Sequence, residues 1–316
     1  MTDRVVLRFL AAPGDTTTKS GLVSAGRLLE WIDKAAYACA VGWSRGYSVT
    51  AYVGNVRFQR SVAPGELVEV HARIVQTGTT SMHILISVHA KHPSEPEYHE
   101  VMHCLSVMVA VDPAGHPTSV PQWEPQNLVE LDLPELIAER VTLRREIQAK
   151  MLAAPYTDAG TAPRSKLRFL ATPADVNFGG KVHGGTLMRW IDEAGFSCAA
   201  SWSSGDAVAI YAGGIQFAAP IRIGDIVEVE ARLIYTTPRS MHVAITASSA
   251  PIERPTELTR NARCMAIYVV PEGGRATPVR QWEPVSEEDR ILVAHAKELI
   301  ALRAKMPPLP ASVSRI

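Results

Sequence analysis

The sequence predicts an α+β protein made of two tandem copies of one module, each a long central helix wrapped by a curved antiparallel sheet. Three observations predict it: an internal repeat, a helical segment that is apolar almost all round, and a series of strand-like segments after that helix. The repeat is the strongest of the three observations. The segment SAGRLLEWIDKAAYACAVGWS (24–44) aligns without gaps on HGGTLMRWIDEAGFSCAASWS (183–203), 159 residues later.

The same offset continues through the rest of each copy. It pairs Tyr52 with Tyr211, Phe58 with Phe217, Gly65 with Gly224, the Ser-Met-His at 81–83 with that at 240–242, and the Gln-Trp-Glu-Pro at 122–125 with that at 281–284. Chance does not produce so long a series of matches at one spacing. The two copies are therefore expected to fold alike.

Each copy opens with a short apolar strand, LRFLA, and continues with a helix that we expect over 25–42 in the first copy and 184–201 in the second. That helix leaves no wide polar face, so burial on nearly all sides is predicted. The apolar positions in the first copy are Leu28, Leu29, Trp31, Ile32, Ala35, Ala36 and Cys39.

Four strand-like segments follow the helix in the first copy, near 48–59, 66–77, 80–91 and 99–111. They are rich in Val, Ile and Tyr, and Pro-Gly, Thr-Gly or Pro-rich turns separate them. Only a sheet can cover a helix that is apolar on most sides, so an antiparallel meander is expected to wrap around it. The second copy repeats this order.

An amphipathic, charged helix is predicted at the end of each copy, near 127–151 and 286–305. Between the copies, the segment MLAAPYTDAGTAPR has the small residues and prolines of a linker. We place the boundary there, which predicts an N-terminal domain over 1–155 and a C-terminal domain over 156–316.

Composition agrees with two ordinary globular domains and excludes some partners. The 316 residues are 47% hydrophobic and 20% charged, enough for a core in each half. Lys plus Arg and Asp plus Glu number 32 each, which gives no reason to expect nucleic acid or a membrane surface as partner. The start lacks a secretory signal and no apolar run reaches roughly 18 residues, so a cytoplasmic protein is expected.

The cysteines and histidines give no metal signature. Cys39, Cys104, Cys198 and Cys264 lie in apolar segments without paired ligand spacing, which favours reduced packing residues. His99 and His103 are four residues apart, but the sequence around them alternates as a strand does. No metal site is expected.

Two features are unusual for a packed core. The first is Asp33, matched by Asp192, about two turns inside the apolar helix, where an uncompensated carboxylate costs several kcal/mol. Such an acid is either a structural residue on a polar stripe beside Lys34 or Glu193, or a general base or nucleophile.

The second feature is the loop that leads into the second helix, DVNFGGKVHGG (175–185). Glycines at a helix entrance let a ligand approach the free N–H groups of the first turn, as an oxyanion hole requires. A tight turn with close helix packing is the alternative. A phosphate loop is excluded, because Val182 follows Lys181 where Ser or Thr is needed and Asp175 replaces the leading glycine.

The loop resembles the entrance motif of the hotdog acyl-CoA thioesterases, in particular those with tandem hotdog domains, which runs D-x-N-x-x-G-x-V-H-G-G and leads to I-D-E. The matching residues here are Asp175, Asn177, Gly180, Val182, His183, Gly184 and Gly185, then Ile191, Asp192 and Glu193. Two later motifs of the family match Phe217, Pro220, Ile221, Gly224 and Asp225, and the turn Arg239, Ser240 and Met241. The resemblance covers both copies and is specific in the second.

The first copy departs from the motif although it keeps Asp33. Thr17 or Thr18 stands where asparagine is expected, one residue is inserted, and Ser24, Ala25 and Gly26 replace His-Gly-Gly. The family builds its site across two hotdogs, which implies one active site per chain, at their interface, from Asp33 with the residues Asn177, His183, Gly184 and Gly185. The mirror site, from Thr17, Ser24 and Gly26 with Asp192, is expected to be degenerate.

The resemblance implies hydrolysis of acyl-CoA to free fatty acid and coenzyme A. Gly184 and Gly185 would polarise the thioester carbonyl with His183 beside them, Asp33 would activate water or attack directly, and Asn177 would orient water or the carbonyl. Arg239 would bind coenzyme A. No cofactor is expected beyond the coenzyme A of the substrate, and a homo-oligomer, a trimer of double hotdogs, is implied.

Two other functions fit the same residues. A hotdog hydratase or dehydratase would act on enoyl or hydroxyacyl thioesters with His183 as its acid-base group. A non-catalytic module would bind acyl-CoA without turnover, in line with the altered first copy.

Overall fold

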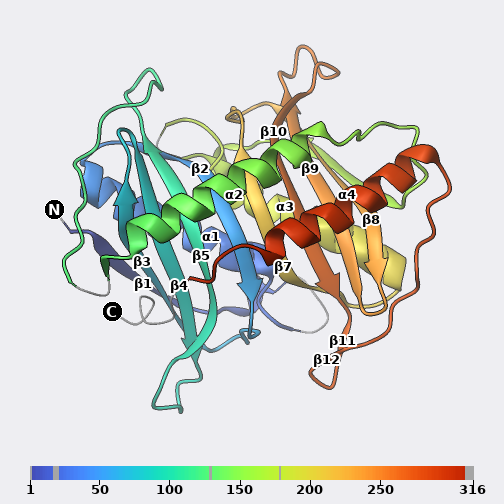
Figure 1. Ribbon diagram of the computed structural model, residues 1–316, viewed down its shortest axis with the longest axis horizontal. Helices are drawn as coiled ribbons and strands as arrows, with labels where there is room; N and C mark the ends of the chain where they lie inside the picture. Colours follow the sequence, from blue (N-terminus) through green and yellow to red (C-terminus); the bar gives the residue numbers. More distant parts are fainter. Residues whose placement is uncertain (1, 17–20, 128–129, 178, 310–316) are drawn as a thin grey trace. The chain divides into compact units, whose positions relative to one another are not determined.

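The computed structural model describes residues 2–16, 21–127, 130–177 and 179–309. The chain divides into two compact units, coloured by sequence in Figure 1. The first contains 1–137, 175–189 and 308–316, and the second contains 138–174 and 190–307. The entrance loop of the second repeat therefore belongs to the same unit as the first repeat's helix.

The sheet of the first unit has the order β1-β3-β4-β5-β2, with antiparallel neighbours throughout. Its strands are β1 (Arg4–Leu10), β2 (Ser48–Phe58), β3 (Leu67–Thr77), β4 (Ser81–Lys91) and β5 (His99–Ala110). The edge strand β1 alternates exposed and half-buried residues, whereas the central strand β4 is buried along nearly all its length. A strand covered on both faces needs apolar side chains on both, and β4 supplies Met82, Ile84, Leu85, Ile86 and Val88. Three polar residues, His83, Ser87 and His89, are buried along the same strand.

Helix α1 (Ala25–Ser44) packs against all five strands of this sheet. It begins at Ser24, whose side-chain oxygen accepts a hydrogen bond from the Arg27 N–H at 3.1 Å. It ends at Arg45, which adopts the left-handed conformation with φ of 56°. The helix is thus defined at both ends, and its apolar sides are buried as the sequence predicts.

The second unit repeats the sheet as β7-β10-β9-β8-β6. The strands are β6 (Arg164–Leu170), β7 (Val208–Phe217), β8 (Ile226–Thr237), β9 (Ser240–Ala250) and β10 (Thr259–Val269), followed by a small hairpin of β11 (Pro271–Glu272) and β12 (Arg275–Ala276). The helices are α3 (Gly184–Ser203), which begins in the first unit, α2 (Leu133–Ala153), which also begins there, and α4 (Glu287–Ala304).

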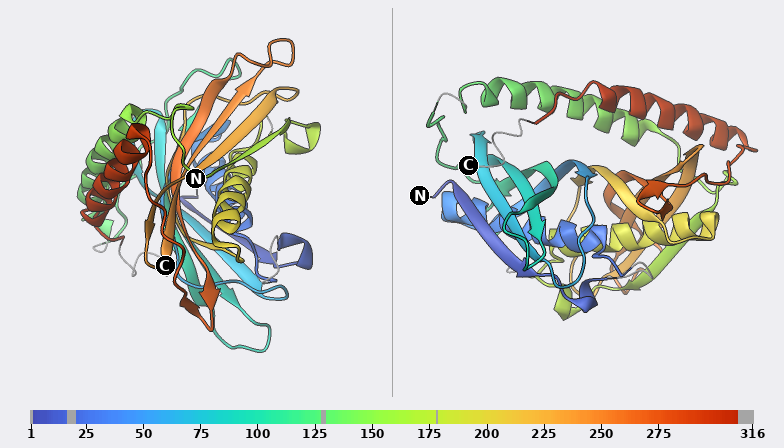
Figure 2. Two further views of the ribbon diagram at one scale, coloured as in Figure 1. Left: turned by 90° about the vertical axis from the view of Figure 1, so that its right-hand side faces the viewer. Right: turned by 90° about the horizontal axis from the view of Figure 1, so that it is seen from below.

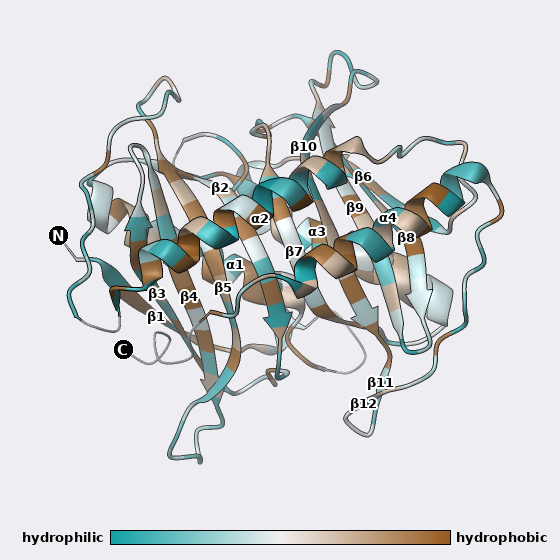
Figure 3. Cartoon of the chain, in the orientation of Figure 1, coloured by the Kyte–Doolittle hydropathy of each residue, from teal (hydrophilic) through white to brown (hydrophobic). Residues whose placement is uncertain are grey.

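Within the second unit, α3 and α4 cover opposite faces of the sheet (Figure 2). Beneath α4 lies a hydrophobic core cluster to which α2, β8, β9, β10 and α4 all contribute. Its buried members are Ile147, Met151, Ile234, Ala244, Met265, Leu292, Ala296, Leu299 and Leu302. Hydrophobic and hydrophilic residues alternate along α4 (Figure 3), because its apolar residues recur at helical spacing.

The segment predicted as a linker is tied down by hydrogen bonds in the second unit. Thr157 donates its N–H and hydroxyl to Glu288, and Thr161 donates its hydroxyl to Asp289 Oδ2 at 2.6 Å. A side chain at Gly160 would lie 3.0 Å from Asp289 Oδ1. The first turn of α4 therefore anchors this connection, so the segment is a bound strap rather than a flexible spacer.

Asp289 is predicted to contribute acid-sensitive stability. Burial alone would raise its pKa, but hydrogen bonds from Thr161 and Ser286 outweigh that and lower its pKa from 3.8 to about 2. Since the pKa is lower in the folded state, the contribution is present above pH 3.8 and is lost as the pH falls towards 2; the shift corresponds to about 2 kcal/mol. Asp289→Asn should lower the free energy of unfolding by about that amount near pH 7.

Denaturant unfolding at pH 7 and at about pH 3 measures this contribution. The difference between Asp289→Asn and the wild type should shrink at the acidic pH, where the carboxylate starts to protonate. Asp158→Asn is the matched control in the same strap, because Asp158 forms one ion pair, with the Arg164 side chain at 2.7 Å, and its carboxylate is 95% exposed. Equal losses in the two variants would contradict the assignment.

The observed elements match the predicted tandem hotdog architecture, and the fold prediction is confirmed. The buried helices and meander strands lie within a few residues of their expected ranges. The four cysteines are buried and free, as their apolar surroundings predict. The domain boundary between 155 and 156 stays a prediction; it falls in the strap between α2 and β6. Within the described residues, no helix combines the length and apolarity needed to span a membrane.

Candidate active site

The carboxylate of Asp33 is the centre of the candidate site. The residue is 2% exposed, and three donors meet its two oxygens. Thr50 donates its hydroxyl to Oδ1 at 2.7 Å, Gly185 donates its backbone N–H to Oδ2 at 2.7 Å, and His183 Nδ1 lies 2.9 Å from Oδ2. The buried charge is thus compensated, which a buried carboxylate requires.

The N-terminus of α3 points at this carboxylate. Gly185 is in the first turn of α3, where backbone N–H groups have no partner inside the helix and the helix dipole is positive. An Asp33 side chain from the first repeat therefore occupies the anion-binding position at the helix entrance of the second repeat. The two residues are 152 positions apart in sequence.

His183 completes the contact with Asp33. Burial lowers the pKa of His183, but the hydrogen bond to Asp33 and the Asp33 charge outweigh it, so the net pKa is raised above 6.5. Gly185 N–H lies 3.2 Å from His183 Nδ1 but only 2.7 Å from Asp33 Oδ2. The shorter contact takes the Gly185 proton, which leaves Nδ1 of His183 as the donor to Asp33.

The two glycines are required by close approach. A side chain on Gly184 would lie 2.9 Å from Thr50 Oγ1 and 3.1 Å from Asp33 Oδ2, and one on Gly185 would lie 2.9 Å from the Glu30 Cα atom. The N–H of Gly184 has no hydrogen-bond partner in the described part of the chain. Gly184 therefore offers an unpaired N–H donor beside the carboxylate, whereas the Gly185 N–H is already bonded to Asp33.

Asn177 lies in the loop before α3, and its contacts are internal to that loop. Its Oδ1 accepts the N–H groups of Gly179 at 2.9 Å and Lys181 at 3.1 Å, and its own N–H donates to the Lys181 carbonyl at 2.7 Å. The side-chain N–H2 group makes no hydrogen bond to a described residue. The carboxamide oxygen of Asn177 is thus fixed by hydrogen bonds within the loop, and its nitrogen is left as a hydrogen-bond donor.

Two site residues, Thr50 and Glu30, were missed by sequence reasoning. Thr50, which binds Asp33, was read only as part of a strand. Glu30, 7% exposed, accepts hydrogen bonds from Arg27 and from Arg189, the latter at 3.0 Å, and so ties α1 to the first turns of α3. The available signal was the repeat itself, since Thr50 corresponds to Ala209 in the second copy.

Asp192, the counterpart of Asp33, has different surroundings. Tyr268 donates its hydroxyl to Asp192 Oδ1 at 3.1 Å, and burial, followed by the Asp192 charge, raises the pKa of Tyr268 well above 10. A side chain at Gly195 would lie 2.2 Å from that hydroxyl oxygen. The first copy has Met108 and Ala36 at these positions, since Met108 lies opposite Thr50 and Met82 as Tyr268 lies opposite Ala209 and Met241. Tyr268 and Gly195 are therefore a matched change in the second copy.

The remaining predicted residues have separate locations. Ser24 caps α1, and Gly26 is buried in its first turn. Arg239 is exposed at the turn between β8 and β9 in the second unit. Thr17 is outside the described residues. In the described part of the chain, no three His, Cys, Asp or Glu residues form a group suited to hold a metal ion.

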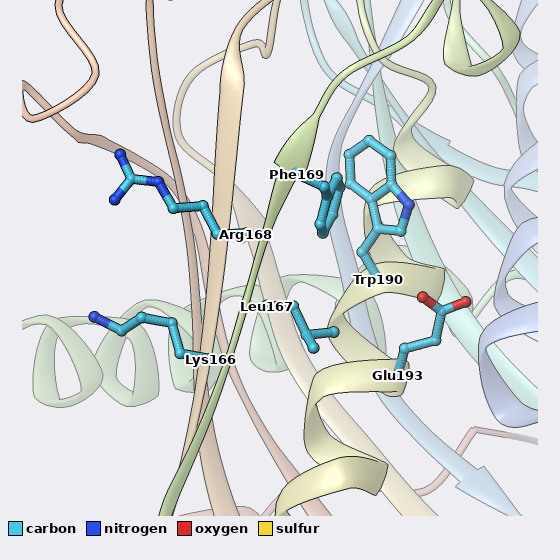
Figure 4. A pocket seen from close by; sticks show the side chains of 6 residues that line it. All are labelled: Lys166, Leu167, Arg168, Phe169, Trp190 and Glu193. Carbon is cyan, nitrogen blue, oxygen red and sulfur yellow. The ribbon is translucent and has the colours of Figure 1, made fainter.

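A pocket in the second unit contains none of the predicted catalytic residues. It lies between β6 and α3 and is lined by Lys166, Leu167, Arg168, Phe169, Trp190 and Glu193. Figure 4 shows the rings of Phe169 and Trp190 against each other, with centroids 4.8 Å apart, and the side chains of Lys166 and Arg168 on the other side of β6. The two basic residues pair with Glu228. Aromatic packing accounts for this region.

The structure has two copies of a buried helix wrapped by a five-stranded meander, and an acid of one copy is held at the helix entrance of the other. These features define a tandem hotdog protein. The chain belongs to the thioesterase superfamily, whose family model matches residues 20–97 and 179–255. Both repeats are covered, and the matched ranges include Asp33, Thr50, His183 and Gly185. The resemblance predicted from the entrance motif is confirmed.

The alignments with individual relatives each span about the length of one repeat. The chain is 39% identical over 120 residues to the acyl-CoA thioester hydrolase YciA of Escherichia coli, which covers 37% of this chain and 90% of that protein. It is 30% identical over 129 residues to protein VdlD of Helicobacter pylori, covering 40% and 74%. The solved structure of a putative oleoyl thioesterase from Lactobacillus plantarum covers 86% of this chain and 98% of its own, with a TM-score of 0.60 and 9% identity, which shows the shared fold.

Proposed function

We propose that this chain hydrolyses acyl-CoA thioesters to free fatty acid and coenzyme A, at one active site formed by Asp33 of α1 and the entrance to α3. The observation that carries the proposal is the buried Asp33 carboxylate, held by Thr50, Gly185 and His183 next to Gly184, whose N–H has no partner among the described residues. The relatives named as acyl-CoA thioester hydrolases support this substrate class.

Gly184 is the proposed oxyanion donor. As water attacks the thioester carbonyl, negative charge develops on the carbonyl oxygen, and a preorganised N–H at a helix N-terminus stabilises it. The removal of one such donor costs about 2.7–4 kcal/mol of barrier. The side-chain nitrogen of Asn177, which makes no hydrogen bond to a described residue, is a second donor that would orient the carbonyl or the water.

Asp33 is the proposed general base. An ionised carboxylate has about four lone-pair sites. Three of those sites are used here, which leaves Oδ1 a position to accept a proton from water. Water gives that proton to Asp33, its oxygen bonds to the carbonyl carbon, the carbon–sulfur bond breaks, and the proton passes to the departing thiolate. Water, thioester and base balance this step, so no cofactor beyond the coenzyme A of the substrate is needed.

The second carboxylate is proposed to be structural. Asp192 is bonded to the hydroxyl of Tyr268, and the residue that corresponds to Thr50 is Ala209. The Asp192 environment therefore differs from the Asp33 environment in two of its polar groups. One working site per chain follows, as the altered entrance of the first repeat also indicates.

Incubation with acyl-CoA tests the function directly. Release of free thiol, followed with a thiol reagent, is the expected result, and a turnover profile over short, medium and long chains defines the substrate. A change in enoyl absorbance without thiol would instead identify a hydratase, and saturable binding without turnover would identify a binding module. Either outcome would overturn the proposal.

Thr50 is expected to act as a positioning residue through its hydrogen bond to Asp33. Thr50→Val keeps the shape but removes the donor, and a hydrogen bond to a charged group contributes about 1.5–3 kcal/mol, so kcat should fall by roughly 10- to 100-fold with little change in KM. Thr50→Ser keeps the hydroxyl and should recover most of the rate. Equal rates for the Val and Ser variants would contradict this role.

Coenzyme A binding by Arg239 and assembly into a trimer of double hotdogs remain predictions of the family resemblance. Arg239→Met should raise KM for acyl-CoA more than it lowers kcat, if the guanidinium binds phosphate in the ground state. Light scattering after size exclusion measures the oligomeric state.

A further inference from the structure

The guanidinium of Arg303 is buried without a hydrogen-bond acceptor. Arg303 lies in the last turn of α4 and is 7% exposed. Within the described residues, its Nε, Nη1 and Nη2 atoms have no partner. A guanidinium carries five N–H donors and stays charged, so its burial without acceptors costs several kcal/mol. An arrangement of this kind calls for a ligand that supplies the acceptors.

The helical spacing turns Arg303 towards the sheet. Leu292, Ala296 and Leu299 form the apolar stripe of α4, and Arg303 comes four residues after Leu299 on that stripe. The guanidinium carbon lies 5.0 Å from the centre of the Tyr211 ring. Tyr211 lies flat over Gly213, where a side chain would be 2.1 Å from the tyrosine hydroxyl oxygen.

Two features favour the positive charge there, but neither accepts its hydrogen bonds. The aromatic face of Tyr211 attracts a cation, and the C-terminal end of α4 is the negative end of the helix dipole. Both act on the charge as a whole. The N–H groups of Arg303 are still left without acceptors.

His242 shares the sheet face with Tyr211. Ile267 of β10 lies opposite Tyr211 of β7 on one side and opposite His242 of β9 on the other, so the three side chains form one row. The strand of His242 is thus separated from that of Tyr211 by one strand, a distance of about 10 Å. His242 is 3% exposed, and its Nδ1 has no partner in the described residues.

The protonation of His242 suits a donor to an anion. Burial, and then the Arg303 charge, lower its pKa to about 4, so the ring is neutral at physiological pH. Ser240 Oγ lies 3.3 Å from its Nε2, and a hydroxyl that donates to Nε2 leaves the ring proton on Nδ1. His242 then offers one N–H donor, and its ring lies near enough to Arg303 for the guanidinium charge to lower its pKa.

The buried layer has an excess of positive charge. Arg232 is paired with Glu230 at 2.7 Å and Glu288 at 2.6 Å. Arg263 instead binds Thr246 Oγ1 and the carbonyl of Met151, and neither carries a charge. In the described part of the chain, Arg263 and Arg303 thus lack a carboxylate partner, and an anion would restore the balance.

The sequence keeps these residue types in both repeats. Tyr211, Gly213, His242 and Arg303 correspond to Tyr52, Gly54, His83 and Arg144 at the 159-residue offset. The entrance residues around the proposed active site differ between the repeats, whereas this group does not. The group around Arg303 and the residues of the helix entrance therefore serve different purposes.

We propose that Arg303 and His242 form a binding site for a compact oxyanion of the phosphate class, on the face of the second unit's sheet opposite α3. The site is distinct from Asp33 and does not depend on the proposed hydrolysis. Its ligand accepts hydrogen bonds from the guanidinium and from Nδ1 of the imidazole, and it neutralises the buried charge.

Thermal unfolding of the full chain with inorganic phosphate tests the site. Phosphate should raise Tm in a saturable way, while chloride at equal ionic strength should not. Arg303→Met should weaken the phosphate response at least tenfold and should raise Tm in phosphate-free buffer, because it removes an unpaired buried charge. Arg280→Met is the matched control, since Arg280 is exposed and stacks 4.2 Å from the Trp202 ring centre.

The same experiment can overturn the proposal. An equal phosphate response in the wild type and in Arg303→Met would place the phosphate elsewhere. If chloride raised Tm as much as phosphate does, the effect would be general screening of charge by salt and not binding at this site. Crystals of the wild type grown with selenate give a readout that needs no variant. An anomalous peak within hydrogen-bond distance of Arg303 and His242 Nδ1 is expected, and density for water alone would refute the site.

Discussion

Asp33→Asn should abolish thioester hydrolysis and leave the fold in place. The amide retains the size of the carboxylate and can still accept from Gly185 or Thr50, but it cannot take a proton from water. General acid–base catalysis contributes about 10²–10⁴-fold, so kcat/KM is expected to fall by about 10³-fold or more. Thiol release under kcat/KM conditions measures the loss, and circular dichroism verifies the fold.

Asp192→Asn is the matched control, since Asp192 occupies the corresponding position of the second repeat. Its carboxylate is bonded to Tyr268, so the variant should lose stability but keep most of the activity. The reverse pattern, an active Asp33→Asn and an inactive Asp192→Asn, would refute the single-site assignment. Equal partial losses would indicate two working sites and refute it as well.

Gly185→Ala is expected to have the second-largest effect. The added methyl group would lie 2.9 Å from the Glu30 Cα atom, which belongs to the backbone of α1 and cannot move aside as a side chain can. The first turn of α3 must shift, and a displacement of about 1 Å at a catalytic group can cost about 10²-fold in rate. Overpacking of this kind also lowers the free energy of unfolding by about 1–3 kcal/mol.

Gly42→Ala separates this effect from helix propensity. Gly42 is an exposed residue of α1, and an added methyl group there would lie at an ordinary 3.6 Å from Thr2 Oγ1. That variant should be as stable as the wild type or up to about 1 kcal/mol more stable, because alanine favours a helix over glycine. Activity of Gly185→Ala close to that of Gly42→Ala would show that α3 can approach α1 differently.

Much of the fold could be predicted because its signals are local and repeated. The predicted helix at 25–42 is observed at Ala25–Ser44, and the strands near 66–77 and 80–91 are observed at Leu67–Thr77 and Ser81–Lys91. Apolar periodicity and turn residues act within a few positions, so they are legible in the chain. The linker was interpreted less well, since its bonds to Glu288 and Asp289 come from residues more than 120 positions away.

The candidate site divides in the same way. The entrance motif and the buried acid pointed to His183, Gly184, Gly185 and Asp33, which the structure brings together. No sequence motif predicted the hydrogen bond from Thr50 to Asp33 or the one from Tyr268 to Asp192, because a hydroxyl on a strand has no local pattern that indicates its partner. Their roles depend on which side chains meet across the helix and sheet.

The amino-acid sequence by itself determined that this protein is a tandem of two hotdog modules with one complete entrance motif, since repeats and periodicity are properties of the chain. Only the tertiary structure decided which N–H is bound: Gly185 donates to Asp33, while the N–H of the neighbouring Gly184 has no partner among the described residues. The physical reason is that a hydrogen bond depends on distances of a few tenths of an ångström between residues far apart in sequence.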